Sequence, residues 1–542
     1  MAGVIHRIFL LSSGVLALEA ALVVVLGYSA ICAVRWLQAS VASVNLRWRA
    51  LLSASGGIGF LVLGLRLHVA RGRISWAPYL DQWYAEIREI MLPYAHGTLT
   101  INGLFAGNNE HRIVLTRALS LLLVTINGEW DNRVTVIAMF VLQSLTVAWL
   151  CGVSWLFFGW IRGSLLSLVA ILPMLLICDW ENIVSGFQTQ FGFLILGSVV
   201  AFAILEIPPS KNSEGWGAIT IGILVLGSMA SGLLTSLSLA FLGFFSLYVL
   251  RRRLSGRDRF YFLAFSIAAV GWITRSRFDP GPIIKAQSLL EFMSAFLAYG
   301  SWPLPPTILG IMLLWIPTIL LFIRILMRRD LDSRDSFVLV LGFWVLLQAG
   351  ALAWSRAGLS NLVSSRYTEV LSLSVFANTM AVLTITTTAR FGNAKIPAWL
   401  AAALWIVIVA GAQVYRSEMI YRSYFDSFSA RSLERESRLL EFTRSDDQRV
   451  ITETQFPHIP CPAEILIPLM RDKSLRRYFP APIRREIARG AGAQGAFATE
   501  AGPLSFLAVH SLRNSWWFTG TGFFGLICAF FIARKEYLHP AL

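Results

Sequence analysis

The sequence predicts an all-α polytopic membrane protein with about thirteen membrane-spanning helices. Of the 542 residues, 56% are hydrophobic and only 14% are charged, and the mean hydropathy is +0.64. Apolar runs recur along most of the chain at the length that a bilayer requires, about 20 residues. These observations exclude an ordinary soluble protein.

The net charge of +15 is concentrated between the hydrophobic runs. Two clusters stand out: Arg251, Arg252, Arg253, Arg257 and Arg259, and then Arg324, Arg328, Arg329 and Arg334. Such clusters are typical of cytoplasmic loops under the positive-inside rule, and they contact anionic headgroups. We therefore expect membrane lipids, and not nucleic acid, as partners. The five cysteines include no Cys-x-x-Cys pair, so neither a zinc spacing nor a disulfide framework is predicted.

The first predicted span covers residues 8–34. A cleavable signal peptide is the alternative, but the run is long and lacks a clean cleavage site. Further spans are expected at 51–70, 133–159, 164–179, 190–206, 217–231, 233–250, 260–274, 306–327, 336–354, 370–388, 396–414 and 514–533. The basic loops then fall on one side, with the carboxyl terminus. The chain divides into a transmembrane module (1–414), a small, partly helical periplasmic segment (415–513) and a last span with a cytoplasmic tail (514–542).

A polar outer loop at 71–132 interrupts the apolar sequence. Its residues 79–93 predict an amphipathic helix, because apolar side chains recur at helical spacing. These are Leu80, Trp83, Tyr84, Ile87 and Met91, with Asp81, Arg88 and Glu89 on another side. Such a helix suits the plane of the membrane interface. Residues 113–126 are apolar but short, which indicates a second interfacial or re-entrant helix.

The outer loop carries two candidate catalytic acids, Asp81 and Glu110. Asp81 would act as a general base or hold an acceptor hydroxyl at the membrane surface. Helix capping after a turn is the alternative. Glu110 stands beside Asn109, His111 and Arg112, where an acid next to cations favours function over a simple helix start. Metal ligation by His111 is not favoured, because no second histidine lies at ligand spacing.

Two further groups are predicted on the outer face. Trp180, Glu181, Gln188 and Gln190 supply amides, an acid and a stacking ring at a membrane edge; an aromatic belt is the alternative for the tryptophan. Arg356 and Arg366 run against the positive-inside tendency, and guanidinium groups grip phosphate with paired hydrogen bonds. A salt bridge from Arg366 to Glu369 is the alternative. Arg275, Arg277 and Lys285 are a looser version of the same pattern.

The motifs together resemble one bacterial branch of the GT-C superfamily of integral-membrane glycosyltransferases. They are Asp81-Gln82-Trp83, Asn109-Glu110-His111-Arg112, Gly186-Phe187-Gln188, Ser365-Arg366-Tyr367 and Ile459-Pro460-Cys461-Pro462. The resemblance covers most of the chain in architecture, but only these short motifs in sequence.

The resemblance implies inverting transfer from a polyprenyl-phosphate sugar to a lipid-linked glycan, lipid or protein. It also implies that Asp81 is the base, that Glu110 assists it, and that Arg356 and Arg366 bind the donor phosphate. The other substrate-binding candidates are Trp83, Asn109, His111, Arg112, Glu181, Gln188, Gln190 and Tyr367. Many members carry a paired acidic motif where this chain has Asp81 alone. A requirement for Mg²⁺ or Mn²⁺ therefore stays open.

The expected location is a bacterial inner membrane, with the site facing the periplasm. A nucleotide-fuelled pump loses support because the sequence has no P-loop and no Rossmann glycine pattern. The alternative is a transporter or flippase for a lipid-linked or polar solute. Transporters usually place ionisable residues at mid-membrane and often show repeat symmetry, whereas these candidates cluster at one face.

Overall fold

The computed structural model describes residues 45–206, 212–275, 284–359, 363–388, 395–453, 461–490 and 500–538. These residues form helices joined by turns, and the only β pairing among them is the isolated bridge between Asn108 and His111. The predicted span at 8–34 lies outside the described residues, as do Arg277, Ile459 and Pro460.

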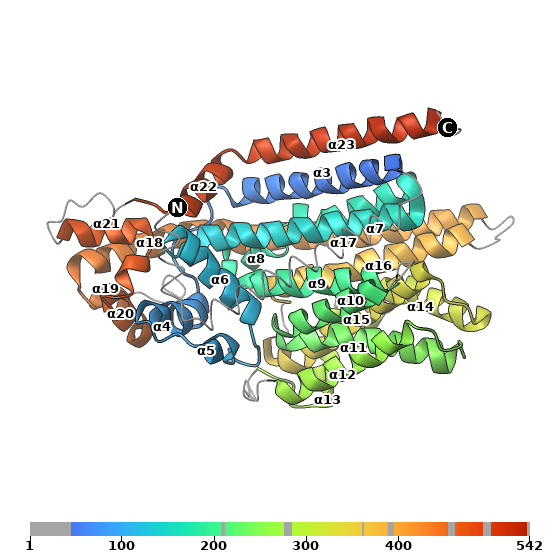
Figure 1. Cartoon of the computed structure of the whole chain (residues 1–542), viewed down its shortest axis with the longest axis horizontal. Coiled ribbons are helices and arrows are strands. Elements are labelled where there is room, and N and C mark those ends of the chain that lie inside the picture. Colours follow the sequence, from blue (N-terminus) through green and yellow to red (C-terminus); the bar gives the residue numbers. More distant parts are fainter. Residues whose placement is uncertain are drawn as a thin grey trace.

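The described helices include nine that are long and apolar enough to cross a membrane, so a polytopic helical membrane protein is confirmed. Most of them run side by side along the longest axis of the molecule (Figure 1). The nine candidates lie in α3 (Asn45–Ala70), α7 (Asn132–Leu175), α9 (Thr189–Glu206), α11 (Leu233–Phe244), α14 (Ile308–Arg328), α15 (Ser333–Ser355), α16 (Ser365–Thr388), α17 (Lys395–Ile420) and α23 (Ser515–Leu538). The short helices η3 (Ala230–Gly232) and η4 (Phe245–Val249) extend α11 to the length of a span, Ala230–Val249.

Helix α7 contains two of the predicted spans. Gly159 has a left-handed backbone (φ 70°) and breaks the helical conformation there, a conformation that glycine adopts at little cost. The two halves then pack together, with Trp155 Nε1 donating to Ser164 Oγ at 3.2 Å. Two shorter helices, α10 (Asn212–Leu226) and α12 (Asp258–Thr274), occupy the predicted spans at 217–231 and 260–274.

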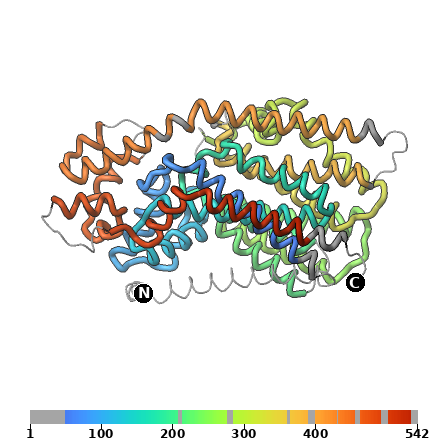
Figure 2. The backbone as a smooth tube through the Cα atoms, turned by 90° about the horizontal axis from the view of Figure 1, so that it is seen from above, coloured from blue at the N-terminus to red at the C-terminus, as the bar shows by residue number. Residues whose placement is uncertain are grey.

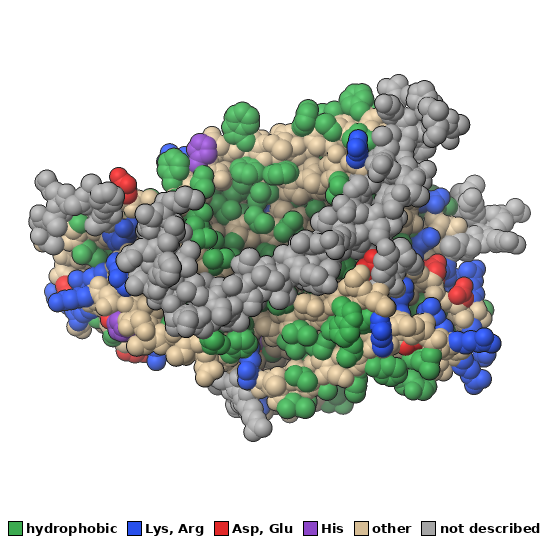
Figure 3. All heavy atoms as spheres, in the orientation of Figure 1, with side chains coloured by type: hydrophobic (Ala, Val, Ile, Leu, Met, Phe, Trp, Pro, Cys, Tyr) green, Lys and Arg blue, Asp and Glu red, His purple; other side chains and the backbone are tan. Residues whose placement is uncertain are grey.

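The basic loops gather at one end of this bundle. Buried Glu206, at the end of α9, accepts a hydrogen bond from Tyr261 at 2.8 Å and lies 3.7 Å from Arg257. Arg324, near the end of α14, pairs with Asp335 at 2.9 Å. Figure 3 shows charged side chains mainly at the two ends of the molecule, with a largely hydrophobic face between them. The basic loops after α11 and α14 therefore lie at the same end of the bundle (Figure 1).

The outer loop and the C-terminal segment form one unit at the opposite end (Figure 1). The predicted helix at 79–93 is present as η1 (Gln82–Met91) and α4 (Leu92–Ala95), and the one at 113–126 as α6 (Val114–Asn127). α5 (Ile101–Phe105) lies between them. The remaining helices of this end are α18 (Asp426–Ser445), α19 (Arg449–Thr452), α20 (Ala463–Arg471), α21 (Ala481–Gly490) and α22 (Pro503–Arg513).

The apolar face of the predicted amphipathic helix packs against protein. Trp83, Ile87 and Met91 are buried in a hydrophobic core that also contains Leu439 and Phe479, from the C-terminal segment. Polar contacts join the same two parts of the chain. Arg484 pairs with Glu129 at 2.6 Å, and the amide of Trp130 donates to the carbonyl of Tyr478 at 2.7 Å. The apolar face of the helix is covered by protein, because burial removes it from water as well as a membrane would.

The boundary expected between residues 414 and 415 falls inside a continuous helix. α17 passes without a break through η7 (Tyr421–Phe425) into α18, and the tube in Figure 2 follows it as one long orange helix. The membrane bundle and the outer unit are thus coupled by a rigid element.

The sidedness of the two ends can be tested with reporter fusions. Alkaline phosphatase, which needs disulfides and therefore an oxidising compartment, should be active when fused after residue 100 and inactive when fused after residue 255. β-Galactosidase fused at the same positions should give the opposite pattern. If alkaline phosphatase is active only when it is fused after residue 255, the orientation of the protein in the membrane is the reverse of the predicted one.

Candidate functional site

Glu110 is presented at the tip of a two-residue hairpin. Asn108 and His111 exchange backbone hydrogen bonds of 2.8 and 3.0 Å, and Asn109 between them has a positive φ of 52°. Asparagine tolerates this left-handed conformation better than most residues. The Asn-Asn-Glu-His sequence therefore turns the chain tightly and directs Glu110 toward the membrane bundle.

The Glu110 carboxylate forms an ion pair with Arg356, which follows the end of α15. The same carboxylate oxygen lies 3.4 Å from His111 Nε2. Arg356 Nε also donates to the Tyr367 hydroxyl at 3.2 Å. Four of the predicted residues, from two distant parts of the sequence, therefore meet at one point.

His111 is held as a neutral ring. Its Nδ1 accepts a hydrogen bond from the amide of Ala230 at 3.3 Å, so the ring proton is on Nε2, facing Glu110. Burial lowers the pKa of His111 to about 4, against the opposing effect of the Glu110 charge. For Glu110, burial alone would raise the pKa, but the interactions with His111 and with the Arg356 guanidinium lower it below its ordinary value. Glu110 is consequently a carboxylate held by its partners and a weak base.

Asp81 has a different environment. It precedes η1 and forms no side-chain capping hydrogen bond, so the capping alternative is not supported. Within the described parts of the chain, its carboxylate has neither a hydrogen-bond nor an ion-pair partner. Burial raises its pKa; the charge of Arg366 opposes this rise and that of Glu181 adds to it. A carboxylate with a raised pKa and no partner is suited to accept a proton.

The backbone around Asp81 is fixed by Asn132, the first residue of α7. Gln82 Nε2 donates to Asn132 Oδ1 at 3.0 Å, and Asn132 Nδ2 donates to the carbonyls of Ser75 and Val184. Leu80, directly before Asp81, has a positive φ of 48°, a strained conformation for leucine. These contacts hold Asp81 against the bundle.

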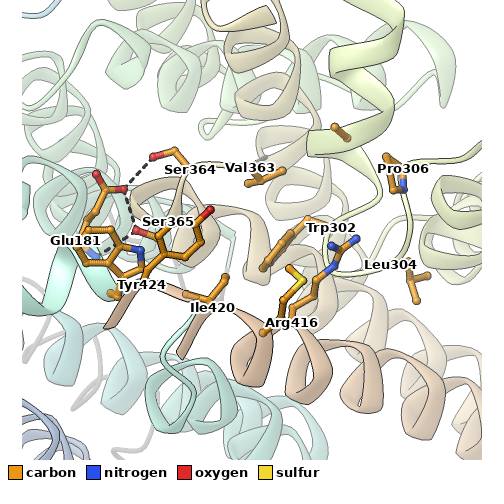
Figure 4. Close-up of a pocket in the computed structure, with 13 residues that line it drawn as sticks. Glu181, Trp302, Leu304, Pro306, Val363, Ser364, Ser365, Arg416, Ile420 and Tyr424 are labelled. Atoms are coloured by element: carbon orange, nitrogen blue, oxygen red, sulfur yellow. Dashed lines mark hydrogen bonds between the residues drawn. The ribbon is translucent and has the colours of Figure 1, made fainter. Parts of the chain in front are cut away.

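Glu181, expected to bind substrate, has a structural role as well. Its Oε2 accepts hydrogen bonds from the hydroxyls of Ser364 at 2.9 Å and Ser365 at 2.8 Å, and from the amide of Arg366 at 3.2 Å (Figure 4). An acid at this position satisfies free amides at the start of α16 and interacts favourably with the helix dipole. One oxygen of the Glu181 carboxylate, Oε2, thus already accepts hydrogen bonds from the protein.

Arg366 does not form the salt bridge to Glu369 that was the alternative explanation. Glu369 instead accepts hydrogen bonds of 3.0 Å from Gln143 and from Asn182. Arg366 Nε is buried without a hydrogen-bond partner. Asp81 and Glu181 both interact electrostatically with this guanidinium. Because Arg366 is at the start of α16, this end of the helix interacts electrostatically with both acids.

A cavity of about 740 Å³ opens beside Glu110. Its polar lining residues are Glu110, His111, Ser231, Arg275, Gln348, Ser355, Arg356 and Tyr367. The rest is apolar and is formed by side chains such as Leu194, Leu234, Phe296, Leu346 and Val370. The cavity is amphipathic, and Glu110, His111, Arg356 and Tyr367 are gathered at one place in its wall.

The structure brings together only some of the predicted site residues. Trp83 belongs to the core of the outer unit, and Gln188 and Gln190 are buried and line neither of the cavities described for this chain. Asn109 and Arg112 flank the cavity residues Glu110 and His111 without lining the cavity themselves. Sequence reasoning missed Arg416 and Trp302, which line a second cavity together with Glu181. Arg416 carried a usable signal, since like Arg356 it follows a predicted span on its outer side.

No group of three or more His, Cys, Asp or Glu side chains that could hold a metal ion occurs in the described ranges. The site residues therefore do not form a ready metal centre. In comparisons with known proteins, no family model matches the sequence, and no curated protein is significantly similar to it.

The neutral state of His111 makes the stability of the protein pH-dependent. Its pKa is about 4 in the folded protein and about 6.5 when unfolded, so the folded state binds fewer protons between these values. Stability should be fully present above about pH 6.5 and fall as the pH drops toward 4. The melting temperature in detergent, measured from pH 4 to 8, should show this decline.

The His111→Gln variant should flatten that decline, while His510→Gln, at an exposed position, should reproduce the wild-type profile. An unchanged profile in His111→Gln would show that other groups cause the pH dependence.

Proposed function

We propose that this protein is a GT-C-type membrane glycosyltransferase with about thirteen spans, which moves a sugar from a polyprenyl-phosphate donor to an acceptor on the periplasmic side of a bacterial inner membrane. The observation that carries the proposal is the amphipathic cavity of about 740 Å³, which has Arg356 and Arg275 among its polar lining residues and mainly apolar side chains along the rest. A lipid phosphate has the same division into an anionic head and an apolar chain.

The cations among the polar lining residues support binding of the donor phosphate. Arg356 is 13% exposed at its side chain and is paired with Glu110. Arg275, at the end of α12, stacks on Trp272 at 3.4 Å and has no ion-pair partner in the part of the chain that the structure describes. A phosphate between them would accept charge-assisted hydrogen bonds from both guanidinium groups. The Glu110–Arg356 pair would hold Arg356 in position before the donor arrives.

The two acids then take different roles. In the proposed reaction the acceptor hydroxyl oxygen forms a bond to the anomeric carbon of the sugar. The bond from that carbon to the phosphate oxygen breaks, and its electron pair leaves with the lipid phosphate. Asp81 accepts the hydroxyl proton, since its carboxylate is unpartnered and its pKa is raised. Glu110 positions Arg356. No step is routed through a metal ion.

The division of roles predicts different kinetics for the two acid variants. Asp81→Asn should lose transfer by at least about 100-fold, the usual contribution of a general base, with little change in donor KM. Glu110→Gln should mainly raise the donor KM, because Arg356 loses its positioning partner. Purified protein would be assayed with polyprenyl-phosphate sugars and a membrane glycolipid extract.

Asp447→Asn is the matched control, because Asp447 is an outer-face acid remote from both cavities. A full rate in Asp81→Asn would remove it as the base. If the wild-type protein transfers sugar from no donor but moves the donor across the membrane of proteoliposomes, the protein is a flippase and not a glycosyltransferase.

The phosphate role of Arg356 is tested separately. Arg356→Gln should raise the KM for the donor by about tenfold or more, as expected for loss of charged hydrogen bonds, and Arg356→Lys should recover part of it. Arg253→Gln, at the opposite end of the bundle, serves as the control. Equal donor KM values for Arg356→Gln and wild type would contradict a phosphate contact.

A further inference from the structure

A second cavity, of about 340 Å³, lies on the other side of the start of α16 (Figure 4). It is bounded by α8 (Trp180–Val184), the turn after α13 (Leu289–Gly300), residues 363–365 and the end of α17. The proposed donor cavity does not include any of its lining residues. The two cavities are therefore distinct.

The second cavity contains a cation without an acidic partner. Arg416, near the end of α17, lies over the Trp302 ring at 5.8 Å and donates through Nε to the carbonyl of Pro303 at 3.4 Å. No carboxylate forms an ion pair with it among the residues that the structure describes. In Figure 4 its guanidinium lies beside Trp302 on the side of the cavity away from Glu181. A positive charge in a half-enclosed site favours an anionic group there.

The walls of the cavity combine aromatic and aliphatic side chains. Trp180 and Tyr424 stack nearly parallel, with ring centroids 6.4 Å apart, beside Glu181. Trp302 Nε1 is buried and has no hydrogen-bond partner, so it is a donor available to a ligand. The aliphatic lining residues are Leu304, Pro306, Val363, Met419 and Ile420. The arrangement suits an amphipathic molecule with sugar hydroxyls and rings at the Glu181 end.

The cavity also borders the start of α14, a candidate span that suits contact with lipid. Pro306 lines the cavity, and Ile308 and Leu309, shortly after it, are 71% and 77% exposed. A molecule anchored in the bilayer could place its chains against these side chains while its headgroup enters the cavity. A soluble peptide or sugar would have no use for the apolar approach.

The segment at 363–367 separates the two cavities. Val363, Ser364 and Ser365 line the second cavity, while Tyr367 lines the first. Arg366 lies between them in sequence and interacts electrostatically with both Asp81 and Glu181. Two substrates bound in the two cavities would thus face the same short segment; the proposed base, Asp81, lines neither cavity and interacts electrostatically with Arg366 of this segment.

We infer that the second cavity is the acceptor site and that the acceptor is a membrane lipid with a phosphate-bearing, glycosylated headgroup. That the bound lipid is the acceptor rests on the proposed function, whereas the binding of a lipid in this cavity does not. Arg416 binds the phosphate, the stack of Trp180 and Tyr424 receives the sugar, and the lipid chains lie against the exposed start of α14.

The lipid site can be tested without any transfer activity. Full-length protein in nanodiscs would be labelled with a diazirine-bearing phosphatidic acid and with the matching diacylglycerol, which lacks only the phosphate. Labelling of residues 416–424 should be about tenfold stronger with the phosphatidic acid. It should fall to the diacylglycerol level in Arg416→Gln and recover partly in Arg416→Lys. Excess inorganic phosphate should leave it unchanged if the lipid, and not free phosphate, is the ligand.

Arg422→Gln is the matched control. Arg422 continues the same helix, is highly exposed and pairs with Glu418, so its loss should leave the labelling unchanged. Arg356→Gln should also leave it unchanged, because Arg356 lines the other cavity. Equal labelling by the two probes, or full labelling of Arg416→Gln, would overturn the lipid site.

The transfer assay then tests the acceptor role. Arg416→Gln should raise the KM for the lipid acceptor by about tenfold and leave the donor KM unchanged, the reverse of Arg356→Gln. A raised donor KM instead would overturn the acceptor assignment. If wild type transfers no sugar but the labelling pattern holds, the proposed function fails while the lipid site stands.

Discussion

A buried ionic network at the outer end of the bundle is the constraint on which the site depends. Arg66 of α3 pairs with Asp179 at 2.6 Å, and Gln143 of α7 donates to both Asp179 and Glu369 of α16. Asn182 of α8 bonds to Glu369 as well. Burying such groups is costly unless every partner is present, so these four helices can pack in only one relative position. That position places Glu181, two residues after Asp179, against the start of α16.

Asn132 extends the same constraint to the outer loop. It bonds to the backbone on both sides, near Ser75 and Val184, and its Oδ1 also accepts the amide of Gly186 at 3.0 Å. A side chain at Gly186 would collide with Thr135, since an added Cβ would lie 1.9 Å from its Oγ1. The loop that carries Asp81 is therefore attached to the turn that carries Glu181. The position of the proposed base is set by contacts among uncharged groups, at some distance from the carboxylate itself.

The sequence predicted much of the fold because hydrophobic length and charge placement act locally. A helix was expected over each of the described spans, and the amphipathic pattern at 79–93 did form a helix. The pattern could not tell which surface would cover Trp83, because protein and membrane interface bury an apolar face equally well. The site could not be predicted in the same way, because its residues come from distant parts of the sequence. Glu110 and Arg356 are 246 residues apart, and no local rule connects them. Arg416 was assigned to a soluble segment because the end of α17 was placed at 414, whereas the helix continues into η7 and α18.

Four arginines at helix ends have a common physical reason in this arrangement. Arg275, Arg356, Arg366 and Arg416 lie at the ends of α12, α15, α16 and α17, on the side that the predicted topology places outside, where the positive-inside tendency disfavours them. Of these, Arg356 is paired with an acid in the described structure, through Glu110, and Arg366 lies between Asp81 and Glu181. Arg275 and Arg416 stack on tryptophans instead, one at each cavity. An aromatic face stabilises a cation less than a carboxylate does and leaves its hydrogen bonds available. In the proposed reaction between two phosphate-bearing lipids, Arg275 and Arg416 would each offer these hydrogen bonds to one phosphate, since each of them lines one of the two cavities.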